Sequence, residues 1–332
     1  MTTKKTGKRW LIIAAIIAVV LLCAVAAGSY YSVGSALRCK IPASGQAEPG
    51  MSARTIISGG IERCYFLYTP PDYDPDTPTP IVFSFHGFLS NPNSHAMITG
   101  WHNLAKEEGF LVVYPEGTKF PKRWNAGATW GDTEVDDTQF FLDILEDVSG
   151  IAAVDPTRVY VNGFSNGGGM TVRIACDAAD RVAAFGSVAG AVVDMDNCNP
   201  SRPAPMIAFH GTSDPVVNYE GLGMQYRLLR TGAGLTHAPT NFVGAENWIA
   251  MWADFNGCDP APEPIPQQGE VYGVRYTHCD EDANVVLYTV EGGGHTWPGG
   301  MPLIVTGKTT NDINATREMW EFFQGYSLED VP

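Results

Sequence analysis

Residues 159–170, VYVNGFSNGGGM, place a β-branched run directly before Gly163-Phe164-Ser165-Asn166-Gly167 and two further glycines. Glycines flank a serine in this way where the backbone turns so sharply that a neighbouring Cβ would collide. Residues 158–161 are typical of a short buried strand and 170–176 of a helix. The pattern therefore predicts a strained strand-to-helix turn with the hydroxyl of Ser165 exposed at its tip. A glycine-rich turn whose serine caps the next helix is the alternative.

Apolar strand-like segments alternate with helical segments along the body of the chain. The predicted strands are 55–58, 63–69, 81–86, 110–114, 158–161, 184–188, 206–209 and 284–290, and the predicted helices are 101–108, 135–148, one from 166, 246–255 and 313–323. Such alternation indicates an α/β fold with a mostly parallel central sheet and helices on both faces. Only about 17 residues separate Val188 from Met206, so no large cap domain is expected there. An uncapped cleft would admit a polymer.

The first 28 residues indicate export. Four cations precede the uncharged run 10–27, which ends in small residues that fit a cleavage site. The segment 1–28 is predicted to be a signal peptide or an N-terminal membrane anchor, 29–52 a linker and 53–328 one catalytic domain. The remainder would be secreted or held on the outer face of the membrane. A formal charge of −15 makes nucleic acid an unsuitable partner.

Six of the seven cysteines lie after the export segment, an even number that suggests three disulfides. Sequence alone leaves about 15 pairings open. We hypothesise nearest-neighbour pairing, Cys39–Cys64, Cys176–Cys198 and Cys258–Cys279. No cysteine or histidine cluster has the spacing of metal ligands, so no metal is predicted.

A serine nucleophile needs a base within hydrogen-bond reach and an acid that orients the base. In α/β-hydrolases the acid follows the serine, and the histidine comes last. Strand 206–209 runs into HGTSDP, which makes Asp214 the candidate acid, and strand 285–290 runs into EGGGHTWPGG, which makes His295 the candidate base. His237 and His278 also follow Asp214, but His278 adjoins a predicted disulfide cysteine.

Acyl transfer also needs donors for the oxyanion of the tetrahedral intermediate. The backbone N–H of Asn166 and that of Phe88, in the loop after IVFSFHG, are the candidates. His86 is predicted to support this loop and is not assigned as the base.

Six segments together resemble one known family: HGFLSN, RWNAG, VDDTQFFLDIL, VDPTRVYVNGFSNGGGM, AFHGTSDPVVNYEG and VEGGGHTWPGG. They look like the secreted polyhydroxybutyrate depolymerases and feruloyl esterases of carbohydrate esterase family 1 and its LpqC-like relatives. The likeness covers about residues 53–325 and implies an α/β-hydrolase fold, with Ser165, Asp214 and His295 as the triad. Where many relatives carry a cysteine pair after WNAG, this chain has Ala128-Thr129-Trp130.

Three tryptophans, Trp124, Trp130 and Trp297, are candidates for an aromatic substrate platform, and core positions are the alternative for each. Asp136 and Asp137 are interpreted as carboxylates at a helix N-terminus that also tie down the preceding loop.

These features predict a secreted serine esterase that needs no cofactor. Its expected substrates are feruloyl or acetyl esters of plant polysaccharide, with polyhydroxybutyrate as the alternative. A serine peptidase of the same fold and a catalytically idle surface-binding protein are the rival functions.

Overall fold

The computed structural model describes residues 49–328, except 120, 128–134, 193–194, 196–197, 222–241 and 303–305. The predicted export segment and Trp130 lie outside this part of the chain. Strand β1 begins at Met51, two residues inside the segment predicted as a linker. Within the described ranges, no helix is both long and apolar enough to cross a membrane.

Ten strands form one sheet in the order β1-β2-β4-β3-β5-β6-β7-β10-β9-β8. The strands are β1 (Met51–Ser58), β2 (Ile61–Tyr68), β3 (Thr79–Phe85), β4 (Leu111–Pro115), β5 (Val154–Phe164), β6 (Ala184–Val188), β7 (Met206–Gly211), β8 (Glu263–Gln268), β9 (Val271–Tyr276) and β10 (Val285–Val290). The run from β4 to β10 in the sheet order is parallel, and two antiparallel strands flank it on each side. The predicted mostly parallel sheet is confirmed.

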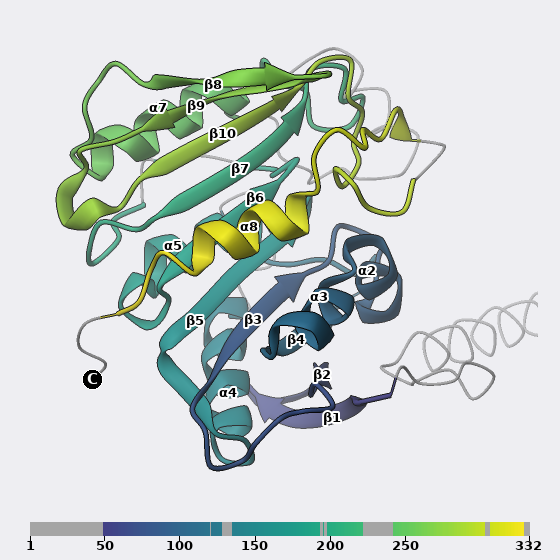
Figure 1. Ribbon diagram of the computed structural model, residues 1–332. Helices are drawn as coiled ribbons and strands as arrows, with labels where there is room; N and C mark the ends of the chain where they lie inside the picture. The colour runs from purple at the N-terminus through teal and green to yellow at the C-terminus, as the bar shows by residue number, and fades with distance from the viewer. Residues whose placement is uncertain are drawn as a thin grey trace, which may run out of the picture.

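Helices cover both faces of the sheet (Figure 1). They are α2 (Pro92–Thr99), α3 (Trp101–Glu108), α4 (Asp137–Ser149), α5 (Asn166–Asp177), α7 (Ala245–Phe255) and α8 (Ala315–Phe323), with short 3₁₀ turns η1 (Ala179–Arg181) and η2 (Asp280–Asp282). Helices α4, α5 and α7 pack on one face, and α2, α3 and α8 pack on the other. No large cap domain is present among the described residues, and the fold is that of an α/β-hydrolase.

Each central strand is buried on both faces because its side chains alternate between two cores. In β3, for example, Ile81 and Phe83 point into the core beneath α4 and α5, whereas Val82 points into the core beneath α3 and α8. Burial on both sides explains why these strands are continuous apolar runs in the sequence.

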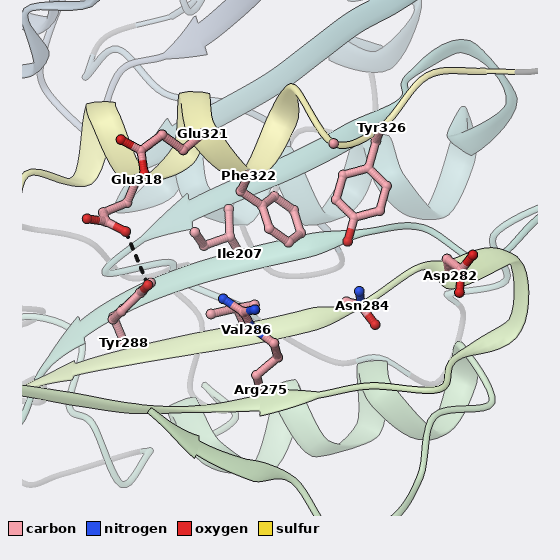
Figure 2. A pocket seen from close by; sticks show the side chains of 11 residues that line it. Ile207, Arg275, Asp282, Asn284, Val286, Tyr288, Glu318, Glu321, Phe322 and Tyr326 are labelled. Atoms are coloured by element: carbon pink, nitrogen blue, oxygen red, sulfur yellow. Dashed lines mark hydrogen bonds between the residues drawn. The ribbon is translucent and has the colours of Figure 1, made fainter. Parts of the chain in front are cut away.

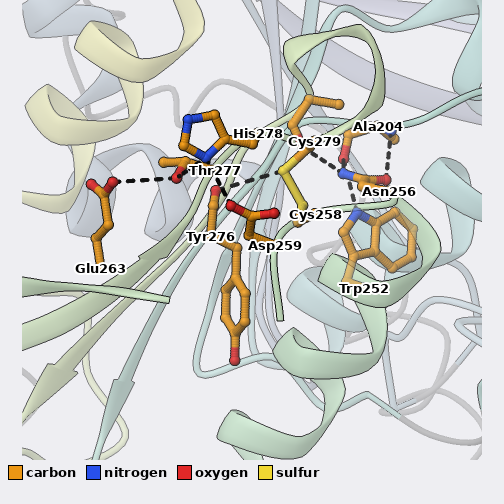
Figure 3. The surroundings of a disulfide bond; sticks show 11 residues. Ala204, Trp252, Asn256, Cys258, Asp259, Glu263, Tyr276, Thr277, His278 and Cys279 are labelled. Carbon is orange, nitrogen blue, oxygen red and sulfur yellow. Dashed lines mark hydrogen bonds and ion pairs between the residues drawn. A yellow bond between two sulfur atoms is a disulfide. The ribbon is translucent and has the colours of Figure 1, made fainter. Parts of the chain in front are cut away.

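Two predicted disulfides are confirmed, Cys176–Cys198 and Cys258–Cys279. The second joins the end of α7 to the segment between β9 and β10, where the Asn256 side chain also bonds the backbone of Ala204 (Figure 3). Cys39 lies outside the described residues, so its pairing with Cys64 stays a prediction.

The start of α4 explains the paired aspartates. Asp136 caps the helix by accepting a hydrogen bond from the N–H of Gln139 at 2.8 Å. Asp137 is buried, pairs with Arg63 at 2.7 Å and accepts the N–H of Asn125 at 2.7 Å. Both carboxylates therefore act as predicted, one on the helix terminus and one on the preceding loop.

Candidate active site

Ser165 occupies a strained turn between β5 and α5. Its φ of 57° and ψ of −119° lie in a region that residues other than glycine rarely adopt. Three backbone hydrogen bonds hold it there: its N–H donates to Val188 O at 2.9 Å, and its carbonyl accepts from Gly169 N and Ala191 N, both at 3.0 Å. This turn presents the Ser165 side chain at the carboxyl end of the parallel strands.

The glycines around Ser165 are required by close backbone contacts. A Cβ at Gly163 would lie 2.2 Å from Gly167 O, and one at Gly167 would lie 2.1 Å from Phe85 O. A Cβ at Gly168 would lie 2.8 Å from the Cα of Gly190. The first turn of α5 thus rests directly on the ends of β3 and β6, which only residues without a side chain allow.

The loops that follow β7 and β10 bring the candidate acid and base together. These strands are parallel neighbours, so their carboxyl ends meet at one edge. The loops are bonded to each other: Ser213 N donates to Gly293 O at 2.9 Å, and Gly292 N donates to Thr212 Oγ1 at 2.8 Å. As a result, His295 Nδ1 lies 2.7 Å from Asp214 Oδ2.

The Asp214 carboxylate is buried, and every donor around it favours its charged form. Oδ1 accepts the N–H groups of Val216 and Val217 at 2.8 Å each, and Oδ2 accepts from His295. Burial alone would raise the pKa of Asp214, but the adjacent His295 and His210 outweigh it and hold this pKa far below its usual value. An ionised Asp214 fixes the proton of a neutral His295 on Nδ1, which leaves Nε2 free to accept a proton.

His210 is a part of this site that the sequence-based prediction does not include. Its Nε2–H donates to Val217 O at 2.8 Å and lies 3.4 Å from Asp214 Oδ2. The residue is buried at the end of β7, four positions before the acid. The HGTSD sequence places it there, but only the folded loop shows that it faces the carboxylate.

Two further contacts bring the serine turn to the same edge. The ring of Phe164, which precedes Ser165, packs on His295 with centroids 4.8 Å apart. A Cβ at Gly87 would lie 3.3 Å from Ser165 Cβ, so the loop after β3 contacts the serine directly. The structure therefore gathers the serine turn, the acid–base pair and the candidate oxyanion loop at one edge of the sheet.

His86 supports the oxyanion loop with both ring nitrogens. Nδ1–H donates to Gly87 O at 2.7 Å, and Nε2 accepts the N–H of Gly117 at 2.9 Å. Complete burial lowers the pKa of His86 to about 4, which keeps the ring neutral at pH 7. Because both nitrogens are engaged in loop contacts, the ring has a supporting role, as the sequence predicts.

Asn166 connects the serine turn to the loop after β4. Its Oδ1 accepts Trp124 N at 2.8 Å, and its Nδ2 donates to Trp124 O at 3.2 Å. Its own backbone N–H belongs to the first turn of α5, where no helix carbonyl is available to accept it. The assignment of the Asn166 and Phe88 N–H groups to an oxyanion hole stays a prediction.

The predicted aromatic platform is wrong for Trp124 and Trp297, since both side chains are fully buried. Trp124 Nε1 donates to His86 O at 2.7 Å, and Trp297 Nε1 donates to Thr316 Oγ1 at 3.0 Å. Both rings therefore support the site loops from the interior. An exposed apolar side chain lies instead at Leu89, beside Phe88; it is 61% exposed, with φ at 62°.

His278, the alternative candidate for the base, contacts Asp259 instead of Ser165 or Asp214. Its side chain is 75% exposed and pairs with Asp259 at 3.0 Å, beside the Cys258–Cys279 disulfide (Figure 3). Within the described ranges, no group of three His, Cys, Asp or Glu side chains is arranged to hold a metal ion.

Comparisons with known proteins find similar esterases. The family model described as "Esterase PHB depolymerase" matches residues 63–221. Feruloyl esterase B of Piromyces equi is 31% identical over 236 residues, which are 68% of this chain and 41% of that protein. The probable feruloyl esterase C of Aspergillus niger is 29% identical over 291 residues, covering 84% of this chain and 92% of that protein.

Among solved structures, the acetyl xylan esterase from Aspergillus awamori has the same fold, with a TM-score of 0.56 at 16% identity. The match covers 82% of this chain and 99% of that one. The chain spans less than half the length of the Piromyces relative. The chain is thus similar to the esterases that the polyhydroxybutyrate depolymerase model represents and to these feruloyl esterases.

Proposed function

We propose that this protein is a secreted serine esterase that hydrolyses carboxylic esters, with feruloyl or acetyl esters of plant polysaccharide as substrates. The observation that carries the proposal is the 2.7 Å hydrogen bond between His295 Nδ1 and buried Asp214, beside the strained turn of Ser165. An ionised acid, an oriented imidazole and a serine at one sheet edge are the parts that acyl transfer requires.

In the proposed reaction, Ser165 Oγ attacks the ester carbonyl carbon while His295 Nε2 takes the hydroxyl proton. The N–H groups of Phe88 and Asn166 stabilise the oxyanion. Collapse of the tetrahedral intermediate breaks the ester C–O bond, and His295 returns the proton to the departing alcohol. Water then attacks the acyl-serine by the same route and releases the acid. Asp214 stabilises the positive imidazolium in both steps.

Two observations favour an aromatic acyl group. The Piromyces and Aspergillus niger relatives are named as feruloyl esterases. In addition, exposed Leu89 offers apolar surface on the loop that contacts Ser165. The description of the matching family model favours polyhydroxybutyrate as a second candidate substrate. Two disulfides in the described chain and the basic, apolar N-terminal segment support export.

The full chain should be expressed in a host that exports it and recovered from medium and membrane fractions, which also tests localisation. Ser165→Ala is compared with Ser149→Ala, a matched change at an exposed serine that ends α4. Substrates are p-nitrophenyl acetate, methyl ferulate, acetylated xylan, hydroxybutyrate oligomers and a peptide amide. The proposal expects ester hydrolysis that Ser165→Ala abolishes and Ser149→Ala preserves. Equal rates for wild type and Ser165→Ala on every ester would reject it.

A further inference from the structure

A pocket lies on the α8 face of the sheet, and the residues that line it do not include Ser165, Asp214 or His295. Its volume is about 410 Å³, within the range of small-ligand sites. We call it the α8 pocket. The residues that line it include Arg275, Asn284, Glu318, Glu321, Phe322 and Tyr326.

The α8 pocket sits at the opposite end of the strands from Ser165. Ile207, at the start of β7, forms part of its floor, whereas Asp214 follows the end of β7. None of the residues that line the α8 pocket belongs to the serine turn or to the loops that carry Asp214 and His295. A ligand in the α8 pocket would leave the serine site accessible.

The walls of the α8 pocket combine apolar and polar surface. Ile207 and Val286 form an aliphatic floor, and the rings of Phe322 and Tyr326, with centroids 4.8 Å apart, project toward it from α8 and the turn that follows (Figure 2). The Tyr288 hydroxyl donates to Glu318 at 3.1 Å and closes one end. The pocket therefore offers two aromatic rings above an apolar floor.

Polar groups surround this apolar surface with hydrogen-bonding capacity to spare. The side chains of Arg275, Asp282 and Glu321 form no hydrogen bond or ion pair with any described residue. Carboxylates outnumber cations in the lining, three (Asp282, Glu318 and Glu321) to one (Arg275). The excess of negative charge disfavours an anionic ligand, and a purely apolar ligand would desolvate the carboxylates without compensation.

We propose that the α8 pocket binds a neutral oligosaccharide. The C–H face of a pyranose ring packs on aromatic side chains, and its hydroxyl groups both donate to carboxylates and accept from a guanidinium or amide. This pairing of ring faces and hydroxyl groups matches the combination of aromatic rings, acceptors and one Arg donor in the pocket. The site would hold the protein on a polysaccharide while the serine edge stays free, and it stands whether or not the esterase proposal holds.

The test uses the full chain carrying Ser165→Ala, so that no ester turnover interferes, and titrates it with xylohexaose. Hexagalacturonate and spermidine serve as anionic and cationic probes. Hydrogen–deuterium exchange of the xylohexaose complex should show protection in residues 318–326 and 271–276 and none in 163–167. Protection confined to 163–167, or no binding at millimolar xylohexaose, would overturn the proposal. Tighter binding of either charged probe than of xylohexaose would also overturn it.

Two variants locate the binding. Phe322→Ala should weaken xylohexaose binding about tenfold, and Glu321→Gln, an isosteric change at an exposed position, should weaken it by a smaller factor. Phe255→Ala is the matched control, because Phe255 is a 38% exposed phenylalanine near the end of α7 on the other face. Circular dichroism checks that each variant folds. Unchanged affinity in both folded pocket variants would refute the assignment.

Discussion

Replacement of Asp214 by Asn tests the acid–base pair most directly. Three N–H groups donate to the Asp214 carboxylate: two backbone amides at 2.8 Å and His295 at 2.7 Å. An Asn side chain has one acceptor oxygen, so its amide NH₂ must face at least one of these donors. If the oxygen keeps the two backbone bonds, the NH₂ faces His295 Nδ1 and forces the imidazole proton onto Nε2. That tautomer cannot accept the proton of Ser165.

The size of the effect follows from the same geometry. A carboxylate 2.7 Å from an imidazolium stabilises it by about 4 to 6 kcal/mol at an effective dielectric constant of about 20. Loss of that stabilisation in the transition state corresponds to a decrease in kcat of about 10³- to 10⁴-fold. The measurement is kcat for p-nitrophenyl acetate at pH 7.5, with a thermal melt to confirm that the variant folds.

Asp259→Asn provides the matched control. Asp259 also pairs with a histidine Nδ1, at 3.0 Å, but both side chains are largely exposed. Exposed pairs of this kind contribute about 0 to 1 kcal/mol, so this variant should keep wild-type kcat and stability. A folded Asp214→Asn protein with kcat within tenfold of wild type would refute the reasoning about the imidazole tautomer.

Three further predictions concern the support of the site. Gly167→Ala places a methyl group 2.1 Å from a β3 carbonyl and should prevent soluble folding, whereas Gly150→Ala, where the nearest atom is 3.4 Å away, should be tolerated; soluble expression compares them. Because the pKa of His86 is lowered to about 4, the unfolded chain binds this proton first on acidification. The contribution of His86 to the free energy of unfolding should therefore fall by up to about 3 kcal/mol from pH 6.5 to pH 4, so in urea titrations a His86→Gln variant should show a shallower fall than wild type. Removal of the Cys258–Cys279 disulfide by paired serine substitutions should cost about 2 to 4 kcal/mol in the same urea assay, with activity retained under native conditions.

The centre of the fold and the His295–Asp214 contact could be predicted because local signals determine them. Strands buried on both faces appear as apolar runs, and the glycines at the serine turn reflect backbone contacts with β3 and β6. The order serine, acid, histidine along the chain selected Asp214 and His295, and adjacent strands β7 and β10 bring them together.

The outer strands β8 and β9 and helix α2 could not be predicted from such signals. Strand β8, EPIPQQ, contains two prolines and is exposed along most of its length, so it has neither alternation nor an apolar run. Proline is tolerated there because β8 is the last strand of the sheet and needs pairing on one side only. Helix α2 has only eight residues and begins with a proline at its first position.

The environment of individual side chains was the least predictable feature. Trp297 lies two residues after His295, but the chain turns its ring into the interior, where Trp297 contacts His95 and Phe164. His210 is close to Asp214 because the loop after β7 folds back, so that the carbonyl of Val217 accepts a hydrogen bond from the His210 ring. Both facts depend on tertiary contacts that no local pattern encodes.

The bonded loops after β7 and β10 hold Asp214 and His295 together as one structural unit. Six register pairs join the two strands, and the cross-loop bonds of Ser213 and Gly292 close the unit around Asp214 and His295. Ser165 follows the end of β5, which lies on the other side of β6 from β7 and β10. We therefore expect that residues 206–214 could not be replaced by the equivalent segment of a relative unless residues 285–295 were replaced with them.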